Sequence, residues 1–575
     1  MSGTPASVDG QPVATGRRDL WIDLAWFAIL AVWSAAWCLT AADRIGATFD
    51  EPFYLGTALD RSPQGLVGVT AINGVMPLPV MTATIPVRLH EWRTGTQLEE
   101  KNTVELIKLL GAARGTNLFW FWLLIFAAMR LGRATAGPWA GRIAAALIAA
   151  DPNFLAHASL ATTDIAVTAA LVGFTWAVSV GRGGGWWRRV VLPGLWFGVA
   201  VLCKLSALLY GGVIIVALEV LYRISSGALV RPTGAGYGAW GLQIAGATLR
   251  SVLSVAAVIA VGVVVTIVVF GFPPPGHAPL SQIAPKIPDS EPLKPRYTAL
   301  AAKYDPVPYA VAAFAFQLWH NSTGRPSYLN GTYYPEGWRF HFPVLMAMKI
   351  PVAALLLGLV ALLRMRRGFS PLVVVALALV AVSLTAKLQI GVRLVLPAIA
   401  LGYIAVAVAV VRGFARCGVW LGVLTVVAVA ATSVWVWPYG LGYLNQLAGG
   451  PSAAAARVSD SNLDWGQGIP DLLAWHKANG EPPIKLWYFG TDPAAWQPPF
   501  TQIGPERAAI TNGDELKRLV GPHYLAVGTT ILSLHPELTA SKREAVAYLR
   551  TLTPVARTST FVIYDLRGHV QPARE

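Results

Sequence analysis

The feature that most constrains this chain is a series of long apolar runs separated by short basic segments. The first run, residues 21–40, reads WIDLAWFAILAVWSAAWCLT. It matches the ~20 residues that a helix needs to cross the hydrocarbon core of a membrane. Further runs lie at about 115–129, 135–150, 162–181, 190–206, 207–222, 251–272, 343–363, 370–386, 393–411 and 418–437. The pattern predicts a polytopic α-helical membrane protein with about eleven transmembrane helices.

The composition supports a chain surrounded by a lipid bilayer. Of its 575 residues, 55% are hydrophobic and 13% are charged, whereas soluble domains carry about 25% charged residues. A net charge of +15 would suit nucleic acid, but the Lys and Arg residues cluster between apolar runs, as membrane orientation requires. We therefore expect no nucleic-acid partner. The three cysteines lie in or beside apolar runs and form no disulfide or metal-ligand pattern.

The basic clusters also predict an orientation. With eleven crossings, the short Arg-rich connections all fall on one side, which the positive-inside rule makes cytoplasmic. Residues 1–18 then form a cytoplasmic N-terminal tail and 19–437 a transmembrane domain. Loops at about 43–113 and 273–342 face outward.

Residues 438–575 differ in composition from the apolar runs and also fall on the outer side. The segments IKLWYFG and HYLAVG are typical of buried strands, whereas 465–479 and 540–552 are typical of helices. We expect a small extracytoplasmic α/β domain here.

Ionisable residues gather at the outer membrane boundary of this topology. They are Asp50, Glu51, Arg114, Asp164, Lys204, Lys387 and Arg393. A charge near the hydrocarbon costs a few kcal/mol, so it usually has a partner or a function. Cations can hold a phosphate leaving group, and a carboxylate can take a proton from an acceptor hydroxyl. Taken singly, the carboxylates could also be helix caps or polar helix ends and the cations membrane anchors.

Several stretches carry a resemblance to a known superfamily. They are FDEPFYLGTALD, DPNFLAHASLATTDIAVTAA, CKLSALL, GRPSYLNGTYYPEGWRFHFPVLMAMKIP, IGVRLVLP and SDSNLDWGQGIPDLLAW, in that order over roughly residues 20–500. Together they resemble the polyprenyl-phosphate-sugar-dependent glycosyltransferases of the C-type fold. The likeness is greatest to the protein O-mannosyltransferase and aminoarabinose-transferase-like superfamily, in its bacterial branch.

The resemblance implies transfer of a sugar from a polyprenyl-phosphate donor to an acceptor hydroxyl, with inversion, on the non-cytoplasmic face of a bacterial inner membrane. It implies that Asp50 is the catalytic base and that Glu51 and Asp164 are acidic partners in the site. It also implies that the donor phosphate is bound by four cations: Arg114, Lys204, Lys387 and Arg393. No cofactor is implied, and dependence on a divalent metal stays open. The acceptor, which could be protein, lipid or polysaccharide, also stays open.

Two other classes of protein are alternatives to a glycosyltransferase. A transporter or lipid flippase also uses charged residues near the membrane, but it predicts repeated halves with Gly/Pro-broken spans, and the sequence has no such halves. A non-catalytic surface scaffold leaves the convergence of charges at one boundary unexplained.

Overall fold

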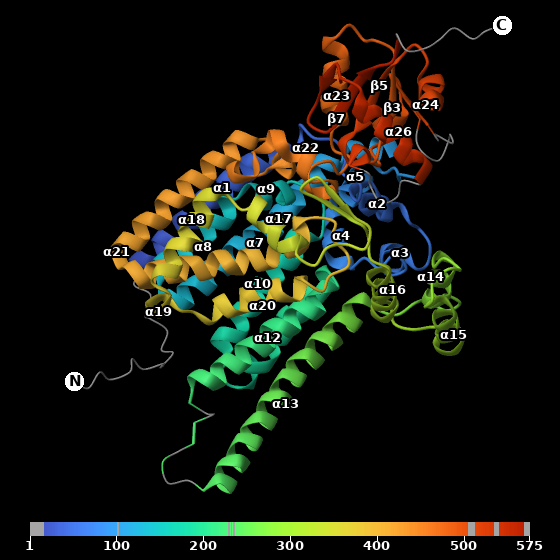
Figure 1. The fold of residues 1–575 in the computed structure, drawn as a ribbon. Helices are drawn as coiled ribbons and strands as arrows, with labels where there is room; N and C mark the ends of the chain where they lie inside the picture. The colour runs from blue at the N-terminus through green and yellow to red at the C-terminus, as the bar shows by residue number, and fades with distance from the viewer. Residues whose placement is uncertain are drawn as a thin grey trace, which may run out of the picture.

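The computed structural model describes residues 17–99, 103–227, 230–231, 233, 236–503, 512–533 and 540–567. Most of the predicted tail, residues 1–18, lies outside the described part. A bundle of long helices makes up the body of the molecule, and a region containing a β-sheet lies against one end of it (Figure 1).

Each predicted apolar run lies on a helix. The helices are α1 (Arg17–Ala42), α7 (Leu110–Ala136), α8 (Pro138–Ala150), α10 (Asp164–Gly181), α11 (Leu192–Cys203), α12 (Ser206–Ser225), α13 (Tyr237–Phe270), α17 (His341–Lys349), α18 (Val352–Leu363), α20 (Pro371–Ser383) and α21 (Leu396–Val436). Within the described residues, six helices are long and apolar enough to cross a membrane, or seven if the bent pair α17 and α18 is one span. The chain is therefore a multi-pass membrane protein, and the number eleven stays a prediction.

The longest of these helices, α21, carries two of the predicted runs. Its backbone leaves helical geometry at Ala415, where φ is 50° and ψ is −124°. A Cβ added at Gly418 would lie 2.2 Å from the carbonyl oxygen of Val410, although residues eight apart on a straight helix are about 12 Å apart. The chain therefore reverses direction here, and the two halves of α21 pack against each other.

The short, alanine-rich run at 135–150 lies at the centre of the bundle. Every residue of α8 from Ala140 to Ala150 is buried, and its strongest packing is against α7 and α21. A Cβ added at Gly141 would lie 2.3 Å from the carbonyl oxygen of Met129. Small residues let helix backbones approach this closely inside membranes, which accounts for the alanine-rich sequence.

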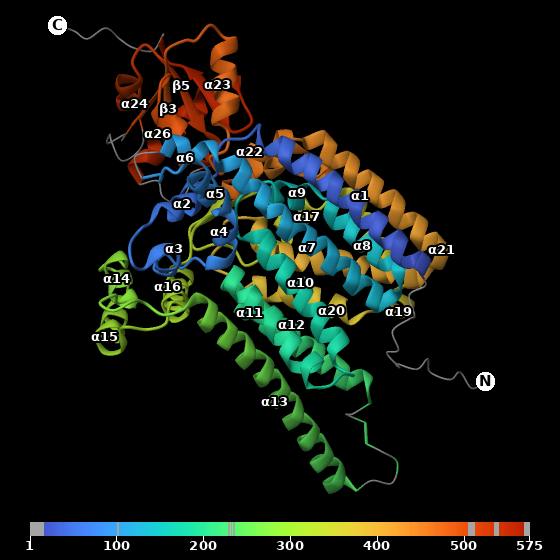
Figure 2. The same cartoon turned by 180° about the vertical axis from the view of Figure 1, so that it is seen from behind.

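The two long predicted outer loops lie beside each other at one end of the bundle (Figure 2). The first holds α2 (Glu51–Gly56), α3 (Gly65–Ala71), α4 (Pro77–Ala83), α5 (Ile85–Thr94) and α6 (Thr103–Lys108). The second holds α14 (Pro279–Ile283), α15 (Lys294–Tyr304), α16 (Tyr309–Thr323) and the antiparallel hairpin of β1 (Ser327–Leu329) and β2 (Thr332–Tyr334). Helix α16 packs on α3, so the two loops form one layer over that end.

The C-terminal part of the chain contains a five-stranded mixed sheet in the order β4-β3-β5-β7-β6. Its strands are β3 (Ile484–Trp487), β4 (Phe500–Gln502), β5 (Tyr524–Gly528), β6 (Ala556–Arg557) and β7 (Phe561–Asp565). Strands β4 and β5 run parallel to β3, whereas β7 is antiparallel to both β5 and β6. These helices lie beside the sheet (Figure 1): α23 (Ile469–Ala478), α24 (Gly513–Val520) and α26 (Ala540–Thr551).

Candidate active site

Asp50 lies in the short connection between α1 and α2, which the C-terminal part of the chain holds in place. The backbone N–H of Gly46 donates to Gln467 O at 2.8 Å, and that of Phe49 donates to Trp465 O at 2.8 Å. Asp50 is the N-cap residue of α2, but its side chain makes no capping hydrogen bond. Its carboxylate is therefore available for other contacts.

Asp50 belongs to a cluster of four charged side chains. Nη1 of Arg393 lies 2.9 Å from Oδ2 of Asp50 and 3.9 Å from Oδ2 of Asp164. Nζ of Lys204 lies 2.5 Å from Oδ1 of Asp164. The side chains of Asp164 and Arg393 are 1% and 8% exposed, whereas those of Asp50 and Lys204 are 28% and 25% exposed. The two negative and two positive charges thus cancel. One side chain of each sign, Asp50 and Lys204, is partly exposed to solvent.

The elements that supply this cluster come from four distant parts of the chain. Asp164 is the first residue of α10, and Lys204 follows the last residue of α11. Arg393 lies on η5 (Val392–Val395), a short 3-10 helix just before α21. The ends of separate helices therefore meet where the sequence predicted the outer membrane boundary.

Glu51, the neighbour of Asp50, points into the protein instead. Nε and Nη2 of Arg114 donate to Oε1 and Oε2 of Glu51 at 2.8 and 2.7 Å. The backbone N–H groups of Thr48 and Ala161 donate to the same carboxylate. Burial alone would raise the pKa of Glu51, but Arg114 and these hydrogen bonds outweigh burial and hold it below its usual range. Glu51 therefore stays ionised as part of a fully buried ion pair.

The remaining N–H groups of Arg114 are also occupied. Nη1 donates to Ala42 O at 2.8 Å and Ile45 O at 2.9 Å, and Nη2 donates to Gly46 O at 2.6 Å. All five guanidinium donors thus have partners, and the side chain is buried. A phosphate could reach Arg114 only by displacing one of these bonds.

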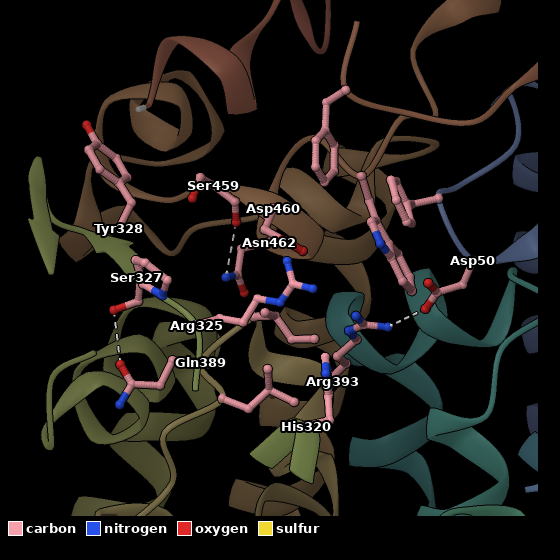
Figure 3. Close-up of a pocket in the computed structure, with 16 residues that line it drawn as sticks. Asp50, His320, Arg325, Ser327, Tyr328, Gln389, Arg393, Ser459, Asp460 and Asn462 are labelled. Atoms are coloured by element: carbon pink, nitrogen blue, oxygen red, sulfur yellow. Dashed lines mark hydrogen bonds and ion pairs between the residues drawn. The ribbon is translucent and has the colours of Figure 1, made fainter. Parts of the chain in front are cut away.

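Asp50 and Arg393 line a pocket, hereafter the first pocket, with about 820 Å³ of empty space including the part open to solvent. Its other lining residues are Phe49, His320, Arg325, Pro326, Ser327, Tyr328, Leu388, Gln389, Ile390, Ser459, Asp460, Asn462, Trp465 and Phe489. Asp50 lies at one end and Tyr328 at the other, with Arg325 extending between them (Figure 3). Both outer loops, the turn before α21 and the C-terminal part all contribute walls.

The motif SDSNLDW, residues 459–465, fixes the turn that carries Arg393. The ring of Trp465 lies under the Arg393 guanidinium, with 4.0 Å between Cζ and the ring centroid. Oδ1 of Asn462 accepts a hydrogen bond from the backbone N–H of Val392 at 2.9 Å. A Cβ at Gly391, where φ is 144°, would lie 2.1 Å from Oγ of Ser461, so this close contact requires glycine.

A buried lysine, Lys349, also binds the backbone of this motif. Nζ of Lys349, at the end of α17, donates to Leu441 O at 2.5 Å and to Asn462 O at 2.7 Å. Its own carbonyl accepts from Nδ2 of Asn153 at 2.8 Å. Lys349 therefore connects the bundle to the segment that positions Arg393.

The seven residues singled out in the sequence fall into three groups. Asp50, Asp164, Lys204 and Arg393 form the charged cluster, and Glu51 and Arg114 form the separate buried pair. Lys387 is exposed and does not line the first pocket, although its carbonyl accepts from the backbone N–H of Arg325 at the pocket wall.

Sequence reasoning did not assign roles to Lys349, Asn462 or Trp465. The signal for Lys349 was a lysine inside the apolar block VLMAMKIP, where an unpartnered charge is costly. Asn462 and Trp465 belong to a motif that the sequence singled out without a function. Within the described residues, no group of three or more His, Cys, Asp or Glu side chains could hold a metal ion.

No protein-family model and no curated protein matches this chain. Among solved structures, it is similar to ArnT from Cupriavidus metallidurans bound to undecaprenyl phosphate, at 16% identity and TM-score 0.44, covering 95% of this chain and 98% of that one. It is also similar to the archaeal oligosaccharyltransferase AglB from Archaeoglobus fulgidus in complex with an inhibitory peptide and a dolichol-phosphate. That match has 13% identity and TM-score 0.40, covering 96% of this chain and 76% of that one.

Proposed function

We propose that this protein transfers a sugar from a polyprenyl-phosphate donor to an acceptor hydroxyl at the non-cytoplasmic face of a bacterial inner membrane. One observation carries the proposal. Asp50 and Arg393 face each other on the wall of the first pocket, and Asp164 and Lys204 lie directly behind them. A carboxylate and a cation in contact at the end of an apolar bundle suit a reaction that moves a proton and releases a phosphate.

In the proposed mechanism the donor phosphate competes with Asp50 for Arg393. Because the cluster balances two carboxylates with two cations, an incoming phosphate would take over donors of Arg393 and Lys204 and free the Asp50 carboxylate. Charge-assisted bonds from a guanidinium to phosphate are short and strong, so this exchange is chemically reasonable. Buried Asp164 would keep both cations in position after the exchange.

The chemical step balances as an inverting displacement. The acceptor oxygen attacks the anomeric carbon of the donor sugar while its proton passes to Asp50. The bond between the anomeric carbon and the phosphate oxygen breaks, and its electron pair leaves with the polyprenyl phosphate. Arg393 and Lys204 would stabilise the charge that develops on this leaving group. The residues named here need no metal for this step.

The other predicted residues have supporting roles in this proposal. Glu51 and Arg114 would hold the connection that carries Asp50, since Arg114 binds Glu51 and also donates to three backbone carbonyls of that connection. Lys387, exposed outside the first pocket, would meet the donor only at the pocket entrance. The C-terminal residues 438–575 would form an extracytoplasmic domain over the site, with the N-terminus cytoplasmic.

The test incubates the purified full-length protein with a panel of radiolabelled polyprenyl-phosphate sugars and a membrane extract as the acceptor source. We expect one donor to give a labelled product in which the polyprenyl phosphate has been released. Asp50→Asn should lower the rate by about 10²–10⁴-fold, the usual contribution of a general base. Asp43→Asn, in an exposed carboxylate of the same connection, is the matched control and should retain the wild-type rate.

Normal turnover in Asp50→Asn would overturn the assignment of the base. Transport of the intact lipid-linked sugar across reconstituted vesicles, with no transfer from any donor, would overturn the transferase in favour of a flippase.

A further inference from the structure

A second pocket lies between the sheet and the segment that follows α21. Its lining residues are Tyr328, Ala455, Ala456, Thr529, Leu532, Arg550, Leu552, Pro554, Arg557, Val562 and Tyr564, and it holds about 790 Å³ of empty space including the part open to solvent. Two guanidinium groups and two phenol rings line it, and none of the described residues that line it is Asp or Glu. The described lining of the second pocket therefore offers positive charge and hydrogen-bond donors.

The charges of both arginines act on a tyrosine that lines this pocket. Burial raises the pKa of Tyr564, and the positive charges of Arg557 and Arg550 oppose that rise. Arg550 also donates one hydrogen bond to Leu532 O, which fixes its position. Arg557 has no ion-pair partner among the described residues, so no described carboxylate neutralises its charge.

Tyr328 connects the second pocket to the first, because it lines both. It lies on β1, which is fixed to the C-terminal part by a bridge between Leu329 and Val458 and by a bond from the Tyr328 hydroxyl to Ala456 O at 3.0 Å. Figure 3 shows Tyr328 at the end of the first pocket farthest from Asp50. The two pockets therefore share Tyr328 as a common wall, at the end of the first pocket away from the charged cluster.

We propose that the second pocket binds an anionic saccharide, through a carboxylate or phosphate group held by Arg550 and Arg557. The guanidinium fork matches both groups in a bidentate geometry. If the proposed function holds, this saccharide is part of the acceptor, whose reacting hydroxyl would reach Asp50 along the first pocket. The acceptor part of the inference thus rests on the proposed function, whereas the binding part does not.

The apolar lining favours a saccharide over a lipid headgroup with its acyl chains. The large apolar side chains of the second pocket, those of Leu532, Leu552 and Val562, are buried or half-buried. None belongs to the exposed apolar surface of the described residues. Two guanidinium groups and two phenol rings beside these few apolar side chains suit a polar sugar with a charged group better than an acyl chain.

The test measures direct binding to the purified full-length protein in detergent by saturation-transfer difference NMR. The probes are a hyaluronan tetrasaccharide, which carries carboxylates, glucose 6-phosphate, which carries a phosphate, and neutral maltotetraose. We expect the anionic probes to bind and maltotetraose to bind at least about tenfold more weakly, since charge-assisted hydrogen bonds contribute most of the affinity. Raising the salt concentration should weaken the anionic probes only.

Variants identify the site of binding. Arg550→Gln combined with Arg557→Gln should lower affinity for the anionic probes about tenfold or more. Arg557→Gln alone changes only an exposed side chain and should give a smaller loss even if the double variant does not fold. Arg518→Gln, an exposed arginine on α24 of the same sheet region and outside the pocket, is the matched control and should bind as wild type.

The outcomes separate this inference from the proposed function. Anionic saccharide binding that is weakened in the Arg557→Gln variant, in a protein that transfers no sugar, supports the site and overturns the transferase. Sugar transfer by a protein whose probe binding is unchanged in the arginine variants overturns the site alone. Binding of anionic lipid vesicles through Arg550 and Arg557, with no binding of the soluble probes, overturns the assignment to a saccharide.

Discussion

Arg114 binds both carboxylate oxygens of Glu51, with Nε 2.8 Å from Oε1 and Nη2 2.7 Å from Oε2. The preceding residue, Asp50, directs its carboxylate to Arg393 on the wall of the first pocket. Two adjacent carboxylates at the start of α2 therefore have opposite environments, one buried in the protein and one facing a cavity. Consecutive residues at a helix start project in directions about 100° apart, which separates the two side chains.

We predict that Glu51→Gln destabilises the protein much more than Asp50→Asn does. Breaking a buried ion pair from one side leaves the other charge uncompensated and costs about 3–5 kcal/mol. Asp50 is partly exposed, so its replacement should cost about 1 kcal/mol or less. The measurement is the thermal unfolding midpoint of each variant in the same detergent, with Asp43→Asn as the control. Equal midpoints for the Glu51 and Asp50 variants would contradict the structural role of the pair.

The same pair predicts a pH dependence. Because the folded state holds the pKa of Glu51 below its usual range, the pair stabilises the protein above the unfolded pKa of about 4.3. This stabilisation is lost as the pH falls through the folded pKa. The difference in unfolding midpoint between wild type and Glu51→Gln should therefore be constant above about pH 5 and shrink below about pH 4. A difference that stays constant down to pH 3 would show that Glu51 does not titrate with unfolding.

Replacing Lys349 should change both the stability of the protein and the activity at the first pocket. Lys349→Met removes the ammonium that binds Leu441 O and Asn462 O and keeps an unbranched side chain of similar length. Two buried carbonyls lose their donor, at about 1–3 kcal/mol for each unsatisfied group. The unfolding midpoint should fall, and transfer by the folded fraction should also fall, because Asn462 holds the backbone of Val392 beside Arg393.

Lys349→Arg is the matched variant for this role. A guanidinium retains the charge and the donors, so Lys349→Arg should recover part of the lost stability if the buried site accommodates the larger head group. Loss of stability with unchanged transfer in Lys349→Met would limit Lys349 to a role in folding.

The sequence predicted the helices and the gathering of seven ionisable residues at one boundary, of which four meet in the structure. Membrane helices must be long and apolar, so their ends can be recognised, and a charge beside hydrocarbon has to find a partner. Asp50, Asp164, Lys204 and Arg393 all lie at or near the ends of helices, and they are one another's partners.

The sequence could not predict where Arg114 points or that residues 459–465 form a wall of the first pocket. An arginine near the outer end of a helix can reach a cavity or the carbonyls of its own connection, and only tertiary packing decides between them. In this protein the carbonyls of Ala42, Ile45 and Gly46 take its donors. Trp465 lies far from Arg393 in the sequence, so no local pattern could place its ring against that guanidinium.

The contact between Trp465 and Arg393 gives the last prediction. A guanidinium over an indole ring contributes about 0.5–2 kcal/mol, more where water is excluded, and phenylalanine is the weaker partner. Trp465→Phe should therefore lower kcat/KM for the lipid-linked donor about 2–30-fold in the folded protein. Because the indole is buried, its smaller replacement should also lower the unfolding midpoint. Trp496→Phe, an exposed tryptophan of the same C-terminal region, should retain wild-type kinetics.

If Arg393 binds the leaving phosphate, Arg393→Lys should lose more activity than Trp465→Phe, because an ammonium keeps the charge but lacks the guanidinium fork that binds phosphate in a bidentate manner. Equal activity of Trp465→Phe and wild type would mean that the ring only fills space beside Arg393.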